Sequence, residues 1–298
     1  MIFLDQFKLP THAEEDNICK RGYGLSFDGY TDTRYPCDIF IKKEFHSVDF
    51  SDVTILYGGN GSGKSTLLNL ITKKLNLKRV APFNTSSIFD IFVDCCQYRM
   101  GCDEDGDLLH IPNGSRIITS DDVFDYMLNA RINNADVNND VKKYAKQHLD
   151  LKYSPTIRMT GLKDYENFRE QVLARKKSTR QYVYQNNGKE VSLGSNGETA
   201  LDFFYQKLQD DRLFLLDEPE NSLSPKFQIQ LADMIKDMAK YCGCQFIIET
   251  HSPFMLAIDG AKIYDLDAYP VTIKNWWELE NPRTYFEFFD KHSNLFKK

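Results

Sequence analysis

Long apolar runs are missing from this 298-residue chain. No stretch approaches the roughly 18 apolar residues of a membrane-spanning helix, so we expect no membrane contact. The start lacks a basic region and a cleavage site, which predicts a cytoplasmic protein without a secretory signal. The seven cysteines include no C-x-x-C pair and no matching His/Cys quartet, which argues against structural zinc. The net charge of −6 argues against a nucleic-acid footprint over the whole molecule, although a local basic patch stays compatible with it.

What the chain does have is a glycine-rich stretch between an apolar strand and an apolar helix. Residues 58–66 read GGNGSGKST and fit the phosphate-binding pattern G-x-x-x-x-G-K-[ST]. The glycines let successive backbone N–H groups point into one concavity, and the helix dipole adds positive potential. We expect Lys64 to hold the β- and γ-phosphates of a nucleotide and the Ser65 hydroxyl to reach Mg²⁺. The candidate binding residues are Gly58, Asn60, Gly61, Ser62, Gly63, Lys64, Ser65 and Thr66.

Two carboxylates follow another strongly apolar segment. Residues 213–216 read LFLL, which predicts a strand buried on both faces, and Asp217 and Glu218 come next. A carboxylate at the C-terminal end of a buried strand beside a phosphate loop suits Mg²⁺, so Asp217 is a candidate metal ligand. Glu218 is the candidate general base, because it could polarise an attacking water. Alone, the pattern could be an ordinary polar strand end, but together with Lys64 it favours catalysis.

Two weaker motifs lie on either side of these carboxylates in the sequence. Ser195-Asn196-Gly197-Glu198 precedes an apolar helix, and a hydroxyl with a glycine at a helix N-terminus can form a second anion site. Any helix N-cap has a similar sequence, so these four residues alone are weak evidence for an anion site. His251 follows the buried strand expected at 245–249 and could hydrogen-bond a γ-phosphate, although a single histidine is more often structural.

The spacing of strands and helices predicts an α/β fold with a mostly parallel sheet. We expect residues 1–80 and 191–298 to form its two parts, with short strands at 39–41 and 45–48 leading to the phosphate loop. Residues 81–190 show no single strong periodicity of apolar residues, which indicates an inserted lobe of helical and mixed structure. Inside this lobe, the asparagine-rich residues 133–139 are expected to form a loop between helices.

The end of the expected lobe carries a run of positive charge. A helix is expected at 164–180, followed by a β-hairpin that turns at Asn187-Gly188. Basic side chains with nearby aromatics could bind a nucleic-acid backbone and stack on bases, although a solvated helix face is the commoner case for such a run. The residues concerned are Arg169, Arg175, Lys176, Lys177, Arg180, Tyr182 and Tyr184.

In combination, the four motifs resemble those of ABC-type ATPases. The phosphate loop, S-x-G-E, an apolar strand into Asp-Glu, and Thr-His-Ser-Pro come in the same order. The sequence DEPENSLSP at 217–225 most resembles the corresponding motif of the soluble branch that contains RecF, SMC-like and OLD-type proteins. The part after His251 resembles small stand-alone ATPases of that branch. The resemblance covers about residues 35–80 and 190–290 and hardly touches the middle lobe.

The resemblance implies an ABC-type P-loop ATPase core that binds and hydrolyses ATP with Mg²⁺. Ser195, Gly197 and Glu198 would form the signature that caps the ATP of a second subunit, which implies an ATP-sandwich homodimer. An effector protein or nucleic acid would be the partner, in a role of the DNA-repair or antiviral-defence type. The remaining implied roles are phosphate and Mg²⁺ binding by Lys64 and Ser65, Mg²⁺ binding by Asp217, catalysis by the base Glu218, and γ-phosphate sensing by His251.

Some alternatives stay open at the level of sequence. Gln97 and Asp121 both compete for the position from which relatives sense Mg²⁺, and Asp121, after the strand expected at 116–119, fits better. A transporter's nucleotide-binding subunit is one rival, but the continuation Glu-Asn-Ser-Leu argues against it. A small-molecule phosphotransferase is another, although it would not need the 195–198 motif or His251. No N-K-x-D guanine-binding motif is present, which argues against a GTPase.

Overall fold

The computed structural model describes residues 1–22, 34–154, 165–176 and 196–296. Contacts divide the chain into two compact units. The larger unit combines residues 1–124 with 200–298, and the smaller one contains residues 125–199. In the ranges described, no helix is long and apolar enough to cross a membrane.

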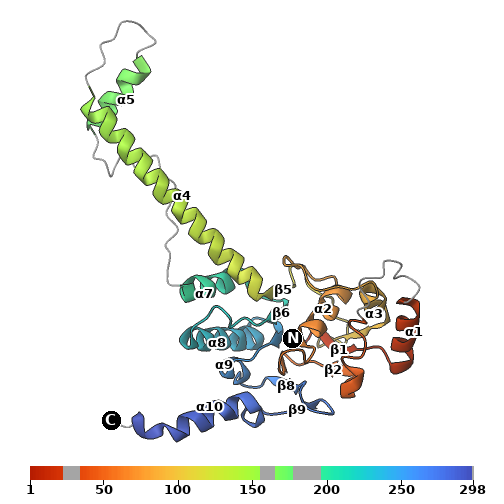
Figure 1. Ribbon diagram of the computed structural model, residues 1–298. Coiled ribbons are helices and arrows are strands. Elements are labelled where there is room, and N and C mark those ends of the chain that lie inside the picture. The colour runs from red at the N-terminus through yellow and green to blue at the C-terminus, as the bar shows by residue number, and fades with distance from the viewer. Residues whose placement is uncertain (23–33, 155–164, 177–195, 297–298) are drawn as a thin grey trace. The chain divides into compact units, whose positions relative to one another are not determined.

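A six-stranded sheet forms the centre of the larger unit, with the order β5-β6-β7-β3-β8-β9. All neighbouring strands run parallel except β8 and β9, which pair antiparallel. The strands are β5 (Arg116–Thr119), β6 (Leu213–Asp217), β7 (Gln245–Glu249), β3 (Val53–Tyr57), β8 (Lys262–Asp265) and β9 (Thr272–Ile273). The expected α/β fold with a mostly parallel sheet is therefore confirmed (Figure 1).

The three central strands are the apolar segments that the sequence suggested would be buried. Every residue of β3 and β7 is buried, as are the first four residues of β6. The rings of Phe214 on β6 and Phe246 on β7 stack across the two strands, with centroids 5.5 Å apart. Continuous apolar runs are what a parallel sheet covered on both faces requires, so β6, β7 and β3 form a rigid base for the loops at their C-terminal ends.

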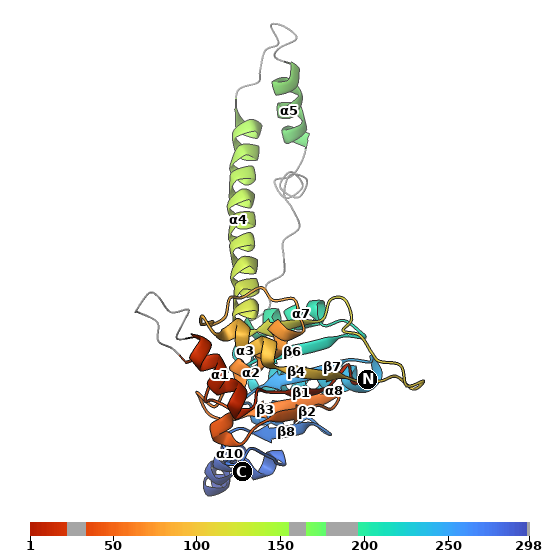
Figure 2. The ribbon, with the colours of Figure 1, turned by 90° about the vertical axis from the view of Figure 1, so that its right-hand side faces the viewer.

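A second, antiparallel sheet has the order β2-β1-β4, with β1 (Leu4–Lys8), β2 (Ser47–Asp49) and β4 (Gln97–Met100) (Figure 2). The prediction of a strand at 39–41 is wrong. The chain there turns into the short 3-10 helix η1 (Ile41–Lys43), because Asp38 and Glu44 on either side adopt left-handed backbone angles that reverse its direction. Phe40, inside this turn, is completely buried.

Besides α4 (Ser120–Tyr153), seven α-helices of the described residues belong wholly or partly to the larger unit. In Figure 1, α8, α9 and α10 lie on the left of this unit and α1 and α3 on its right. The helices are α1 (His12–Gly22), α2 (Lys64–Lys74), α3 (Phe89–Cys95), α7 (Asn196–Lys207), α8 (Pro225–Tyr241), α9 (Pro253–Leu256) and α10 (Glu280–Lys291). Two further 3-10 turns, η3 (Trp276–Glu278) and η4 (Ser293–Leu295), flank α10.

The smaller unit is helical where it is described. Helix α4 (Ser120–Tyr153) continues from the larger unit into it, and α5 (Tyr165–Lys176) packs against the end of α4. The buried ring of His148 on α4 lies 2.9 Å from the carbonyl oxygen of Ala174 on α5. The Gln171 side chain donates to Ser154 Oγ at 2.8 Å. These contacts hold the two helices together by polar groups that are shielded from water.

The prediction of a loop at residues 133–139 is wrong, because α4 is helical throughout this stretch. Asparagine costs a helix no more than about 0.7 kcal/mol per residue relative to alanine, so a long helix tolerates several. The smaller unit also starts at Asp125, whereas the inserted lobe was expected from residue 81. Residues 81–124 join the larger unit because β4 pairs with β1 and β5 with β6. The expected hairpin, with Tyr182 and Tyr184, lies outside the described residues.

Candidate nucleotide-binding and catalytic site

The phosphate loop connects β3 to α2, as the sequence indicated. Gly63 has a φ of +102°, and a Cβ there would lie 2.7 Å from Ile39 Cγ2, so only glycine lets the loop pack this closely. Gly61, with a φ of +82°, faces open space, since no described atom comes within 4 Å of a Cβ built on it. The loop is thus tightly seated at one end and open in the middle, where a phosphate would lie.

Two side chains that the sequence did not single out hold the loop in place. Lys43 Nζ donates to the carbonyl oxygens of Ser62, at 2.8 Å, and Leu266, at 2.6 Å. The Asp267 carboxylate accepts the Gly59 N–H at 2.6 Å. Both contacts join the loop to the segment after β8, far away in the sequence, so no local pattern could have revealed them.

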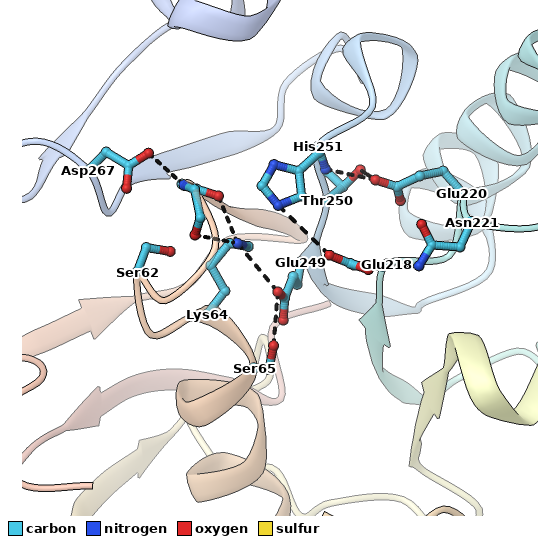
Figure 3. Close-up of polar contacts among 12 residues, drawn as sticks. Ser62, Lys64, Ser65, Glu218, Glu220, Asn221, Glu249, Thr250, His251 and Asp267 are labelled. Atoms are coloured by element: carbon cyan, nitrogen blue, oxygen red, sulfur yellow. Dashed lines mark hydrogen bonds and ion pairs between the residues drawn. The ribbon is translucent and has the colours of Figure 1, made fainter. Parts of the chain in front are cut away.

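Lys64 is buried, with 4% of its surface exposed. Its Nζ donates to the carbonyl oxygens of Gly58, at 2.7 Å, and Gly59, at 3.1 Å, and lies 3.5 Å from Glu249 Oε1 (Figure 3). A cation that already has partners can be kept in a dry site, which an unpaired ammonium could not be. To bind a phosphate, Lys64 must exchange these contacts.

Glu249 ends β7 and is the principal site residue that the sequence reasoning missed. Its Oε1 accepts a hydrogen bond from Ser65 Oγ at 3.0 Å, and only 2% of its surface is exposed. The strand register places it directly opposite Asp217, which ends β6. The rule that singled out Asp217, a carboxylate at the C-terminal end of a buried strand, applies equally to Glu249 and could have found it.

Asp217 and Glu249 influence each other electrostatically. Burial, together with the adjacent Asp217 carboxyl, raises the pKa of Glu249 to about 8. Burial also raises the pKa of Asp217 above its ordinary value. Two carboxyls this close in a dry site do not both ionise readily, so the pair retains a proton near neutral pH unless a cation stabilises both charges.

Glu218 and His251, the two predicted catalytic residues, lie together. His251 Nε2 is 3.8 Å from Glu218 Oε1. Glu218 has a left-handed φ of +46°, held by its N–H, which donates to the carbonyl oxygen of Glu249 at 3.0 Å. The Asn221 amide donates to Glu218 Oε2 at 2.7 Å and orients the carboxylate. Burial and the charge of Lys64 lower the pKa of His251, so its imidazole is neutral at pH 7.

Glu220, two residues after the predicted base, fixes the loop that carries His251. Its Oε1 accepts hydrogen bonds from Thr250 Oγ1 at 2.7 Å, His251 N at 2.7 Å and Ser252 N at 3.1 Å. Glu220 is 9% exposed. It therefore connects the loop after β6 to the loop after β7, a contact that no local sequence pattern indicates.

The two candidates for the Mg²⁺-sensing position lie in different sheets. Gln97 is on β4 of the antiparallel sheet, where it pairs with Lys8. Asp121 is exposed in the first turn of α4, directly after β5 of the main sheet. Its neighbour Asp122 accepts hydrogen bonds from the Thr119 N–H and hydroxyl, at 2.8 and 2.9 Å, and so is used to start the helix. Asp121 makes no such hydrogen bond among the described residues. It therefore stays the better candidate for the Mg²⁺-sensing position.

The remaining predicted residues are placed as follows. Asn60, Gly61 and Ser65 are exposed, whereas Gly58, Ser62 and Gly63 are buried. Thr66 is buried, and its hydroxyl accepts a 3.3 Å hydrogen bond from Tyr35, whose ring stacks on Phe89. Gly197 and Glu198 lie in the first turn of α7, and Ser195 falls outside the described residues.

Three buried polar atoms at the site test whether a magnesium nucleotide fits. Ser62 Oγ, Glu249 Oε2 and His251 Nε2 have no hydrogen-bond partner within the part of the chain that the structure describes. A phosphate with its bound cation would offer acceptors and a positive charge to these atoms. The same ranges contain no ready cluster of three His, Cys, Asp or Glu side chains for a metal. Mg²⁺ usually takes one or two carboxylates and completes its shell with phosphate and water, and Asp217 and Glu249 are two carboxylates that lie opposite each other here.

The family described as “AAA domain, putative AbiEii toxin, Type IV TA system” matches residues 104–257, just over half of the chain. The matched range contains Asp217, Glu218 and His251 and begins after the phosphate loop. No curated protein is detectably similar in sequence.

Solved structures with weak similarity include two Smc heads. The head from Pyrococcus furiosus, bound to the C-terminal domain of ScpA, is 15% identical with a TM-score of 0.40, over 82% of this chain and 95% of that one. The head from Thermotoga maritima is 16% identical with a TM-score of 0.35, over 77% and 92%. A nucleotide-free ATP-binding cassette from an ABC transporter is 14% identical with a TM-score of 0.33, over 73% and 79%. The family match covers more than half of the sequence, and the chain therefore belongs to this AAA-domain family, in agreement with its resemblance to soluble ABC-type P-loop ATPases.

Proposed function

We propose that this protein binds ATP with Mg²⁺ and hydrolyses it. The observation that carries the proposal is the position of Glu249. Its side chain contacts Ser65 and Lys64 of the phosphate loop, and its carbonyl oxygen holds the backbone of Glu218. The groups that we propose to bind phosphate and to accept the proton thus lie at the C-terminal ends of β3, β6 and β7. Membership of an AAA-domain family supports the same activity.

Lys64, Ser65 and the two strand-end carboxylates would bind the substrate. Lys64 exchanges its carbonyl contacts for phosphate oxygens, while the loop N–H groups around Gly61 surround the same phosphates. Ser65, Asp217 and Glu249 are the side chains that would hold Mg²⁺, with Asp121 as a further candidate. When bound, the ion neutralises phosphate charge and orients the leaving group.

Glu218 and His251 would provide the proton transfer and the phosphate contact. Glu218 accepts the proton of the attacking water, and the amide of Asn221 keeps its carboxylate oriented. His251 is neutral because its pKa is lowered, so it offers a hydrogen bond to a terminal phosphate oxygen without competing with Lys64 for negative charge. Glu220 keeps the His251 backbone in register with Glu218.

We also propose a cytoplasmic homodimer in which each copy completes the other's site. The resemblance to ABC-type ATPases supports this assembly, with Ser195, Gly197 and Glu198 as the residues that reach the second ATP. The dimer would act on an effector protein or nucleic acid. The family description names a toxin of a type IV toxin–antitoxin system, which supports a role in defence over one in DNA repair.

Steady-state phosphate release tests the proposed activity. Wild-type protein is expected to release phosphate from ATP only when Mg²⁺ is present. Lys64→Ala removes the cation nearest the phosphates and should weaken nucleotide binding by about tenfold to a hundredfold, as expected for lost charge-assisted hydrogen bonds. Lys42→Ala, at an exposed lysine on η1, is the matched control. Wild-type protein that binds no nucleotide, or Lys64→Ala protein with unchanged affinity, contradicts the proposal.

A further inference from the structure

A cavity of about 560 Å³ borders His251 on the side of the C-terminal helix α10. One wall comes from the catalytic loops and includes Glu220, Asn221 and His251. The opposite wall is aromatic, with Trp276 on η3 and Tyr285 and Phe289 on α10. Tyr285 and Phe289 are four residues apart on one helix, so they lie on the same face. The cavity surface is thus mostly apolar, and Glu220 and His251 are the ionisable side chains in its lining.

The polar wall carries a negative charge with spare hydrogen-bonding capacity. Glu220 uses Oε1 for three hydrogen bonds, whereas its buried Oε2 has no partner among the described residues. Apart from Glu220 and His251, the residues described as lining the cavity are uncharged. No lysine or arginine is among them. A buried carboxylate without a cationic neighbour on the wall favours a positively charged group in the cavity.

The aromatic wall favours the same chemistry. Trp276, Tyr285 and Phe289 are each between about a third and a half exposed, so their rings are available to a ligand. A guanidinium stacks on aromatic faces while donating hydrogen bonds to a carboxylate, and it is more weakly hydrated than an ammonium. Carboxylate and aromatic rings in one cavity therefore suit arginine better than lysine.

The surroundings favour a protein as the source of this arginine. A second hollow of about 520 Å³ adjoins the first and shares Trp276 and Pro282 with it. Trp277 and Phe286 add further exposed aromatic surface there. A small free cation would fill only the first cavity, whereas a polypeptide segment could place an arginine in it and an apolar side chain in the second. Buried arginine and aromatic contacts dominate the energetics of many protein interfaces.

We propose that an arginine side chain of a partner protein docks in the cavity between Glu220 and α10. The wall that receives it is fastened to the catalytic loop, since the Asn281 amide of α10 donates to the His251 carbonyl oxygen at 2.9 Å. Docking would therefore change the position of His251 relative to the γ-phosphate. This last consequence, unlike the docking itself, rests on the proposed function.

The docking can be measured on the full chain without any nucleotide, so its failure is separate from a failure of the proposed ATPase activity. The probe is Nα-acetyl-arginine methylamide, and the matched probe is the corresponding citrulline compound, which has nearly the same shape without the charge. The readout is tryptophan fluorescence, because both tryptophans of the chain, Trp276 and Trp277, line the two hollows. Saturable binding of the arginine probe is expected, with the citrulline probe about tenfold weaker, since charge-assisted hydrogen bonds are roughly twice as strong.

Three variants make the result specific. Glu220→Gln keeps an acceptor for the three loop hydrogen bonds and removes the charge, so it should bring arginine affinity down to that of citrulline. Phe289→Ser should weaken binding without touching the loop. Phe124→Ser, at a similarly exposed ring on α4 outside the cavity lining, should leave binding unchanged.

Equal binding of the two probes, no saturable binding, or unchanged arginine affinity in Glu220→Gln overturns the proposal. Sedimentation provides a further arm. Self-association of the wild type that Phe289→Ser abolishes, without arginine binding, assigns the aromatic wall to a second copy and also overturns it.

Discussion

The Lys64 ammonium and the Ser65 hydroxyl both contact Glu249. These are the two groups that we propose to bind the phosphates and Mg²⁺ of the nucleotide. At about pH 9, where Glu249 with its pKa of about 8 is ionised, Glu249→Gln removes the negative charge beside the phosphates and loosens the hold on Lys64. In the absence of Mg²⁺, we expect this variant to bind ATP about tenfold tighter than wild type, as expected when one like-charge contact is removed. With Mg²⁺ present, the advantage should shrink, because the ion stabilises the carboxylate in the wild type.

A fluorescent ATP analogue titrated with and without Mg²⁺ measures this effect. Asp217→Asn is the matched control, since Asp217 lies opposite Glu249 but has no hydrogen bond to Lys64 or Ser65 in the described part of the chain. It should weaken binding in Mg²⁺ without a comparable gain in its absence. Weaker binding of Glu249→Gln under both conditions would show that the glutamate is needed for binding itself.

The pKa of Glu249 also predicts a pH dependence of stability. Burial raises this pKa from 4.5 to about 8, so the folded protein holds the proton more tightly than the unfolded chain. Its contribution to stability is complete below about pH 4.5 and is lost as the pH rises through about 8. Glu249→Gln imitates the neutral form and should match wild type near pH 5 but exceed it above pH 8, by on the order of a few kcal/mol.

Denaturant unfolding between about pH 5 and 9 in a metal chelator tests this prediction. Glu104→Gln, at an exposed glutamate in the turn at residues 103–106, is the control and should follow wild type. A constant difference between Glu249→Gln and wild type across the whole range would mean that Glu249 does not titrate there.

At this scale, sequence alone could identify groups whose chemistry is local. The phosphate loop and the Asp217-Glu218 pair are contiguous motifs, and the structure brings them to one place. Lys43, Asp267 and Glu220 escaped notice because their partners lie far away along the chain. Their roles depend on packing between loops rather than on spacing within one.

Among the elements, the loop between β7 and α9 depends most on a single side chain. Glu220 accepts three hydrogen bonds from this loop, two of them from backbone N–H groups. Glu220→Ala leaves those donors without an acceptor in a buried place, so we expect a loss of about 2–4 kcal/mol in the free energy of unfolding. Glu220→Gln keeps an acceptor and should cost much less.

Chemical denaturation of the two Glu220 variants checks this difference. Asn221→Ala is a useful comparison, because Asn221 is exposed and its side chain donates a hydrogen bond to Glu218 rather than to the loop after β7. Equal stabilities for Glu220→Ala and Glu220→Gln would mean that water satisfies the loop and that Glu220 does not position it.

The elements differed in how well the sequence predicted them. Strands β6, β7 and β3 are continuous apolar runs, and their burial between helices gives them an unmistakable pattern. The antiparallel sheet depends on the pairing of β1 with β4, about ninety residues later, which no local signal encodes. Helix α4 runs through an asparagine-rich stretch because weak local preferences do not outweigh a long helix.

For the whole molecule, the central prediction is assembly on ATP. If Ser195, Gly197 and Glu198 complete the site of a second copy, a variant that holds ATP without hydrolysing it should accumulate as a dimer. Glu218→Gln is such a variant, and light scattering should show roughly twice the monomer mass in Mg²⁺ and ATP but not in ADP, as for a closed two-fold dimer.

Mixed dimers provide the control for this assembly. Ser195→Arg and Lys64→Ala should each be inactive alone, because each spoils both sites of its homodimer. A mixture should recover activity, since a heterodimer keeps one intact site. Full hydrolysis by a strict monomer, or no recovery in the mixture, contradicts the shared-site assembly while leaving ATP binding itself unaffected.

The most direct test of the central claim follows bound nucleotide in the Glu218→Gln protein. After incubation with Mg²⁺ and ATP, the protein is separated from free nucleotide, quenched in acid, and its ATP and ADP are quantified beside wild type and Glu104→Gln. We predict that wild type and the control yield ADP and phosphate, whereas Glu218→Gln retains intact ATP and hydrolyses at least about a hundredfold more slowly, the usual cost of losing a general base. Hydrolysis by Glu218→Gln at the wild-type rate would contradict the account.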